Sequence, residues 1–146
     1  MAARDKRLRI CIIDGQGGGI GAALIRRVKE CYQEAHEVIA LGTNAVATAQ
    51  MMKARANRGA SGEGAIVHTV TRVDVILGSI SIVLANAMMG EVTPRMAEAV
   101  ASAPGLKILL PLTRAKVEII GVVPEPLPHL VEQVITERLK ELCKNV

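Results

Sequence analysis

Residues 8–21 read LRICIIDGQGGGIG, an apolar run followed by five glycines within the seven positions 15–21. Residues 8–13 predict a buried strand, because a short apolar run that ends at turn residues is typical of a strand covered on both faces. Residues 21–32 predict a helix that begins directly after the glycines. Amides and the dipole at a helix N-terminus favour a phosphate, and glycines let it approach closely. The stretch therefore predicts a strand, a phosphate-binding loop and a helix.

Strands and helices continue to alternate along the rest of the chain. Further strands are predicted at residues 37–41, 65–68, 73–77, 106–110 and 117–123. Further helices are predicted at residues 44–55, 79–89, 93–104 and 127–142. Residues 57–64 contain three glycines and predict a loop.

The strands are nearly continuous apolar runs, which is typical of a parallel sheet covered by helices on both faces. Only residues 111–116 separate the last two strands. A crossover helix does not fit there, so the last strand is expected to lie antiparallel at an edge. The sequence predicts one α/β domain over residues 1–146, a three-layer Rossmann-like fold. It has about six mostly parallel strands, an antiparallel edge strand and a C-terminal helix.

Composition excludes several classes of protein. The net charge is +4 and Tyr32 is the only aromatic residue, so stacking platforms for single-stranded nucleic acid are absent and no specific nucleic-acid signal remains. Cys11, Cys31 and Cys143 lack zinc-ligand or redox spacing, so neither a metal nor a disulfide is predicted. The longest uncharged run, residues 75–90, contains glycine and polar residues and is too short to span a membrane. With no signal peptide apparent, a cytoplasmic protein is expected.

The glycine spacing fits dinucleotide loops in two registers. Gly17, Gly19 and Ala22 fit a relaxed G-x-G-x-x-A pattern. Gly15, Gly19 and Gly21 fit G-x-x-x-G-x-G, which resembles the loop of the short-chain dehydrogenases/reductases and implies an NAD(P)-type cofactor. A P-loop is excluded, because alanines stand where its Lys-Ser/Thr pair belongs.

The choice of cofactor depends on the end of the second strand, where NAD-binding proteins carry an acid for the ribose hydroxyls. This chain has no acid at that place; it has Thr43 and Asn44 instead. Both side chains can donate hydrogen bonds to a 2′-phosphate, so they favour NADP slightly over NAD. Thr43 as a simple N-cap of the next helix is the alternative. The predicted cofactor-binding residues are Gly15, Gln16, Gly17, Gly18, Gly19, Ile20, Gly21, Thr43 and Asn44.

Few other residues suggest chemistry. Asp14 is interpreted as a carboxylate that caps the glycine loop, with a magnesium ligand as the alternative. Glu63 and Glu91 form a candidate acid/base pair, but polar loop and capping roles are the favoured interpretation. His68 is a candidate base or a structural residue, and His36 and His129 are expected to be exposed at helix ends. No catalytic residue is assigned.

The chain resembles three known protein families, and the extent of each resemblance limits which function can be expected. The dehydrogenase resemblance reaches only to about residue 45, and that family's Tyr-x-x-x-Lys is absent, since His36 stands four residues after Tyr32. Residues 42–45 resemble a turn in the tubulin-like bacterial division GTPases, which implies a guanine nucleotide, but that family's second glycine motif is missing. The whole chain resembles a small bacterial family of single-domain proteins without an assigned function. The stretches that carry this last resemblance are residues 13–21, 40–45, 61–63, 85–86 and 90–94.

The sequence thus predicts a protein that binds a phosphate-bearing small molecule, a nucleotide or NAD(P)-type dinucleotide, with the reaction unknown. One alternative is a non-catalytic nucleotide sensor or partner protein. Another is a magnesium-dependent purine nucleotide-binding protein that uses Asp14 or Glu91. The methionine pairs at residues 51–52 and 88–89 favour a homodimer.

Overall fold

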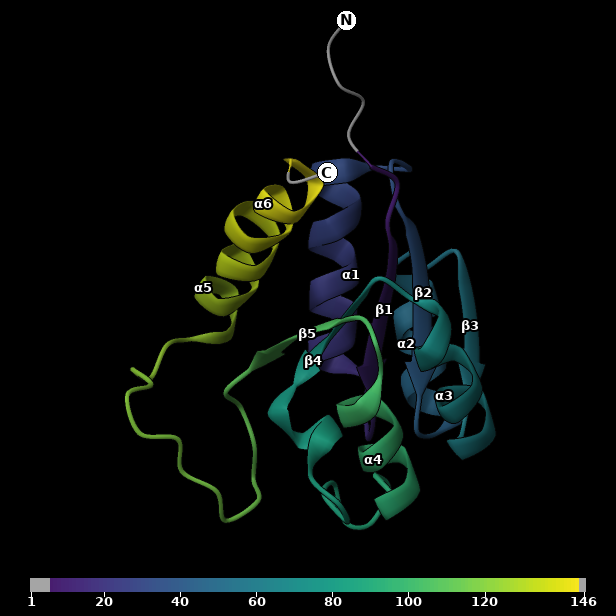
Figure 1. Ribbon diagram of the computed structural model, residues 1–146, viewed down its shortest axis with the longest axis vertical. Coiled ribbons are helices and arrows are strands. Elements are labelled where there is room, and N and C mark those ends of the chain that lie inside the picture. Colours follow the sequence, from purple (N-terminus) through teal and green to yellow (C-terminus); the bar gives the residue numbers. More distant parts are fainter. Residues whose placement is uncertain (1–5, 145–146) are drawn as a thin grey trace, which may run out of the picture.

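The computed structural model describes residues 6–144, in which a five-stranded, wholly parallel sheet forms the middle layer (Figure 1). The strands are β1 (Arg9–Asp14), β2 (Glu37–Gly42), β3 (Arg58–Ser61), β4 (Val75–Ser79) and β5 (Leu106–Leu110). Their order across the sheet is β3-β2-β1-β4-β5. β1 therefore lies in the middle of the sheet. The chain first adds β2 and β3 on one side of β1 and then β4 and β5 on the other side.

Helices cover both faces of this sheet. One face carries α1 (Gly19–Tyr32), α2 (Ala45–Lys53) and the C-terminal helix, and the other carries α3 (Glu63–Thr69) and α4 (Pro94–Ser102). The C-terminal helix consists of α5 (Leu127–Glu132), a π-helical segment η3 (Gln133–Arg138) and α6 (Leu139–Lys144). The predicted three-layer α/β architecture is confirmed.

The two faces are buried in two separate cores because successive side chains of a strand point to opposite faces. Ile10 and Ile12 of β1 pack in the core beneath α1, whereas Cys11 and Ile13 pack in the core beneath α3 and α4. All four side chains are at most 2% exposed. Burial on both faces explains why β1 is a continuous apolar run.

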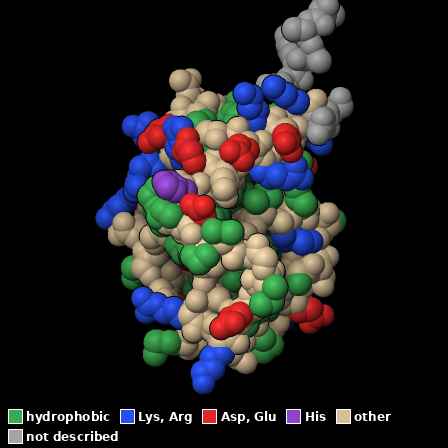
Figure 2. All heavy atoms as spheres, turned by 90° about the vertical axis from the view of Figure 1, so that its left-hand side faces the viewer, with side chains coloured by type: hydrophobic (Ala, Val, Ile, Leu, Met, Phe, Trp, Pro, Cys, Tyr) green, Lys and Arg blue, Asp and Glu red, His purple; other side chains and the backbone are tan. Residues whose placement is uncertain are grey.

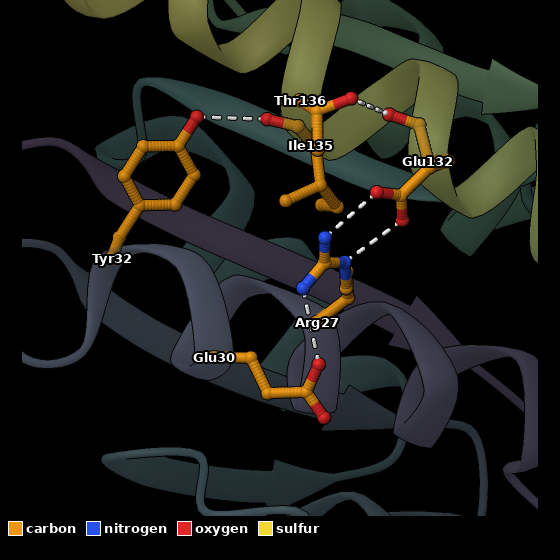
Figure 3. Close-up of polar contacts among 6 residues, drawn as sticks. All are labelled: Arg27, Glu30, Tyr32, Glu132, Ile135 and Thr136. Atoms are coloured by element: carbon orange, nitrogen blue, oxygen red, sulfur yellow. Dashed lines mark hydrogen bonds and ion pairs between the residues drawn. The ribbon is translucent and has the colours of Figure 1, made fainter.

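Two side chains of α1 form hydrogen bonds with the C-terminal helix (Figure 3). The guanidinium of Arg27 donates to both carboxylate oxygens of Glu132, at 2.8 and 2.7 Å. The hydroxyl of Tyr32 donates to the carbonyl of Ile135, inside the π-helical segment, at 2.8 Å. This helix therefore completes the layer beside α1 (Figure 1).

The predicted sixth strand at residues 117–123 is wrong. Residues 111–126 form neither helix nor strand within the described chain, so the sheet has five strands and no antiparallel edge strand. Gly121 adopts a φ of 91°, which interrupts the extended run, and prolines 111 and 124 flank it. The exposed large apolar side chains of this loop are Val117, Ile119, Ile120, Val122 and Val123. Figure 2 shows apolar side chains scattered over the middle and lower part of one face of the molecule.

The third strand also lies elsewhere than predicted. It forms at Arg58–Ser61, inside the predicted loop 57–64, while residues 65–68 belong to helix α3. All four residues of β3 are exposed at the sheet edge, so no apolar run marks it. Ile66 and Val70 are both fully buried, and this spacing of four residues is that of one helix face.

The predicted helix at residues 79–89 is wrong as well. The Ser79 hydroxyl oxygen accepts a hydrogen bond from the Ser81 amide, and it caps only a short 3-10 turn, η2 (Ile80–Val83). Asn86, Met88, Met89 and Gly90 all have positive φ values, between 57° and 89°. Left-handed residues cannot continue a right-handed helix, so residues 84–92 form a series of tight turns.

Candidate functional site

The carboxyl ends of β1 and β4 lie side by side at the point where the strand order reverses. In open parallel sheets this switch point is where ligands bind, because the loops that follow the two strands turn away from each other. A cavity of about 650 Å³ opens there. Its lining comes from the loops after β1, β4 and β5, including Gly15, Gln16, Ser79, Thr113 and Arg114.

The glycine loop begins α1 at Gly19, two residues earlier than predicted. Gly18 precedes it with a φ of 75°, and a Cβ there would lie 2.7 Å from the Ala47 carbonyl oxygen. The helix has no side-chain cap and no acidic residue in its first turn. The N-cap residue itself therefore satisfies none of the N-terminal amides of α1 through a side chain.

Asp14 lies behind the loop and accepts hydrogen bonds from it. Its Oδ1 accepts from the Gly15 amide and its Oδ2 from the Gly21 amide, both at 2.8 Å. Burial raises the pKa of Asp14 above its usual value, while these amide bonds act in the opposite direction. The carboxylate thus holds the loop closed, as the capping interpretation predicts.

Two amides of the loop remain open, those of Gly17 and Gly19. Neither donates a hydrogen bond to a group in residues 6–144. A Cβ added at either glycine would meet no atom within 4 Å. The outer surface of the loop is consequently bare backbone at the start of a 14-residue helix.

Thr43 and Asn44, at the end of β2, lie beside the loop. Asn44, not Thr43, is the N-cap of α2, because its Oδ1 accepts from the Ala47 amide at 2.8 Å. The Asn44 amide also donates to the Gln16 carbonyl oxygen at 3.1 Å. The end of β2 and the glycine loop therefore form one polar surface.

Glu91, a candidate residue in the sequence analysis, also belongs to this surface, but its contacts with the glycine loop and the end of β2 were not predicted. Its Oε1 accepts from the Gln16 amide at 2.8 Å, from the Thr43 hydroxyl at 2.7 Å and from the Asn44 amide at 2.7 Å. These hydrogen bonds, the one from Thr43 foremost, hold the pKa of Glu91 below its usual value. Glu91 reaches the site from the turns at residues 84–92, and no local pattern in the sequence signals this.

The other acidic candidate has separate partners. Glu63 accepts from the Thr93 hydroxyl at 2.6 Å and lies 3.7 Å from the Arg95 guanidinium. Within residues 6–144, Glu63 and Glu91 share no hydrogen-bond partner. The structure thus gives no support to an acid/base pair formed by these two glutamates.

The histidines lie away from the glycine loop. His68 is exposed in the last turn of α3 and lines a different cavity, with Arg9, Arg58 and Arg72. His129 is exposed, as predicted, and pairs with Glu125.

The prediction that His36 is exposed is wrong, because its side chain is buried. Its Nδ1 accepts from the Leu8 amide at 3.1 Å, and its Nε2 lies 3.3 Å from Cys143 Sγ. His36 therefore joins the start of β1 to the C-terminal helix and has a structural role.

Neither a metal cluster nor a membrane span is found in residues 6–144. No three His, Cys, Asp or Glu side chains are placed to hold a metal ion, and no helix is long and apolar enough to cross a bilayer.

Comparison with known protein families matches residues 9–143 to the family described as "Domain of unknown function (DUF3842)". No curated protein and no solved structure matches the chain.

Proposed function

The chain belongs to this family of unknown function, and on that premise we propose from the site that it binds a nucleotide or an NAD(P)-type dinucleotide. The diphosphate lies on the glycine loop after β1. The observation that carries the proposal is the pair of bare, unpartnered amides at Gly17 and Gly19 at the N-terminus of α1. An anion there is stabilised by both the amides and the helix dipole.

The fold itself accounts for only three of the five loop glycines. A Cβ at Gly15 would lie 2.5 Å from the Thr43 hydroxyl, and one at Gly21 would lie 2.5 Å from Met51 Sδ. At position 18 any other residue would be strained, because the backbone there has a φ of 75°. Gly17 and Gly19 have no such constraint, and a ligand that must touch the backbone gives a reason for their missing side chains.

The adjacent cavity supports a ligand larger than phosphate. Its volume of about 650 Å³ lies within the range of small-molecule sites. Hydroxyls of Ser79, Ser81 and Thr113 and the exposed guanidinium of Arg114 line it beyond the loop. These groups suit the polar and charged parts of a nucleotide that extends from the diphosphate toward β4 and β5.

A non-catalytic role as a nucleotide sensor is the second candidate. It is favoured because the ionisable groups nearest the loop, Asp14 and Glu91, each accept hydrogen bonds from the loop backbone. Neither carboxylate is positioned against a histidine or lysine in the part of the chain that the structure describes. Ligand binding with no turnover is the result that this candidate predicts.

A thermal-unfolding panel tests the proposal. The probes are NAD, NADP, ADP, GDP and inorganic diphosphate, each with and without magnesium. A ligand present at one hundred times its dissociation constant should stabilise the fold by about 2.7 kcal/mol. We expect a shift with at least one nucleotide and a smaller shift with diphosphate alone. If none of the probes raises the unfolding temperature, the chain is not a nucleotide-binding protein of this kind.

A further inference from the structure

The strand that normally selects the cofactor ends here without an acid. In dinucleotide-binding sheets an Asp or Glu after the second strand accepts hydrogen bonds from the ribose 2′-hydroxyl. Gly42, Thr43 and Asn44 occupy this place in the chain. In space, however, the Glu91 carboxylate lies against Thr43 and Asn44, at 2.7 Å from each.

We propose that Glu91 is the specificity-determining residue of the site and accepts the ribose hydroxyls of the bound nucleotide. The ligand therefore carries an unphosphorylated ribose, so NAD or a simple nucleotide binds in preference to NADP. The inference rests on the proposed nucleotide-binding function. It reverses the slight preference for NADP that the sequence alone suggests.

The arrangement of the carboxylate supports this role. All three of its hydrogen bonds from residues 6–144 go to Oε1, and Oε2 accepts none from them. Glu91 is only partly buried, so Oε2 is accessible to a ligand. One oxygen thus fixes the carboxylate while the other is left for a hydroxyl donor.

The segment that carries Glu91 is itself closely held. The Asn86 amide donates to the Val92 carbonyl at 2.7 Å, and the Val92 amide donates to the Ala87 carbonyl at 3.1 Å. The carboxylate is therefore a preorganised acceptor, which is what selectivity for a hydroxyl requires.

The charges around Glu91 disfavour a 2′-phosphate. The pKa of Glu91 is below its usual value, so the side chain is ionised at neutral pH. No lysine or arginine in the described chain forms an ion pair with it. Thr43 and Asn44 already donate to Glu91 and are not free to donate to a phosphate. A phosphate on the 2′ position would meet a carboxylate without a compensating cation.

The test compares dissociation constants, measured by titration calorimetry, for NAD, NADP, ADP and 2′-deoxy-ADP. Glu91→Gln is the informative variant, because its carbonyl oxygen can keep the three hydrogen bonds while the charge is lost. Glu98→Gln is the matched control, since Glu98 is an exposed acid on α4. Unfolding curves without ligand establish that both variants fold.

We expect the wild type to bind NAD at least about tenfold more tightly than NADP, and ADP about tenfold more tightly than 2′-deoxy-ADP. Glu91→Gln should weaken NAD binding about tenfold and abolish the preference over NADP, while Glu98→Gln changes neither.

Three results would overturn the inference: equal affinity of the wild type for NAD and NADP, a preference retained in Glu91→Gln, or tighter NAD binding by that variant. The last would show that Glu91 blocks the site. If Glu91→Gln does not fold, the ADP comparison on the wild type decides. Failure of every nucleotide to bind the wild type would instead reject the proposed function itself.

Discussion

At the scale of single residues, two carboxylates accept hydrogen bonds from different amides of the glycine loop. Asp14 accepts from Gly15 and Gly21 on the buried side, and Glu91 accepts from Gln16 at the outer rim. The amides of Gly17 and Gly19 lie between these two contacts and have no partner in the described chain. The loop is thus held in shape by the protein's own anions while its outer face remains free for a ligand.

The stability contributed by Glu91 should depend on pH. Its pKa is lowered in the folded protein, so its hydrogen bonds contribute fully above the unfolded-state pKa of about 4.3 and are lost as the pH falls through the folded-state value. In urea unfolding at pH 7 we expect Glu91→Gln to be less stable than the wild type by about 1 kcal/mol, after allowance for solvent screening. The gap should narrow as the pH falls below the unfolded-state pKa and close once the pH has passed the lowered folded-state pKa. A gap that widens on acidification would contradict this assignment.

Part of this site was predictable from the sequence and part was not. Gln16, Thr43 and Asn44 follow two neighbouring strands, and the carboxyl ends of parallel strands meet at one edge, so their proximity follows from the strand pattern. Glu91 is 75 residues away from Gln16 and follows a segment of left-handed turns that was predicted to be a helix. Its place depends on tertiary contacts that no local spacing encodes.

At the scale of elements, the π-helical segment gives the C-terminal helix its second attachment to α1. Tyr32→Phe removes the hydrogen bond to the Ile135 carbonyl and should lower the free energy of unfolding by about 1 kcal/mol. Thr136→Val is the control, because its hydroxyl bonds an exposed carbonyl of its own helix, that of Glu132. Urea denaturation of both variants checks this. Equal effects would show that the Tyr32 contact does not anchor the helix.

The central strands and the edge strand β5 were predictable, whereas the opposite edge of the sheet, β3, was not. β1, β2 and β4 are buried on both faces, and each therefore appears in the sequence as an apolar run. β3 pairs with β2 alone and is exposed throughout, so its residues need only extended backbone geometry. Residues 117–123 show the converse, because strand-forming residues there pair with no strand within residues 6–144.

At the scale of the whole molecule, the loop at residues 111–126 exposes an apolar surface. Its exposed large apolar side chains, Val117, Ile119, Ile120, Val122 and Val123, have exposed fractions from 41% to 93%. Of the two methionine pairs, Met51 belongs to the core, whereas Met52 and Met89 are 39% and 96% exposed. Exposed apolar patches of this kind mark interaction surfaces, and we propose that the loop forms a homodimer contact.

Sedimentation equilibrium tests the homodimer. We expect a concentration-dependent dimer for the wild type and a monomer for the double variant Ile120→Asp, Val123→Asp, whose side chains are 93% and 69% exposed. The unfolding free energy extrapolated to low protein concentration should change by less than about 0.5 kcal/mol, as is usual for surface sites. A wild type that stays monomeric at every concentration would rule the contact out.

In the proposed function, the bare backbone at the start of α1 binds the phosphates of a nucleotide. Gly19→Glu places a carboxylate there, and the open space around Gly19 lets the variant fold. Gly64→Glu is the matched control, because Gly64 lies in the first turn of α3 with equally open surroundings.

Calorimetric titration of the nucleotide that most stabilises the wild type is the decisive measurement. We expect about a hundredfold loss of affinity in Gly19→Glu, because the carboxylate repels the phosphates and its side chain covers the open amides, and an unchanged affinity in Gly64→Glu. Wild-type affinity in Gly19→Glu would contradict the account, since the ligand would then bind elsewhere.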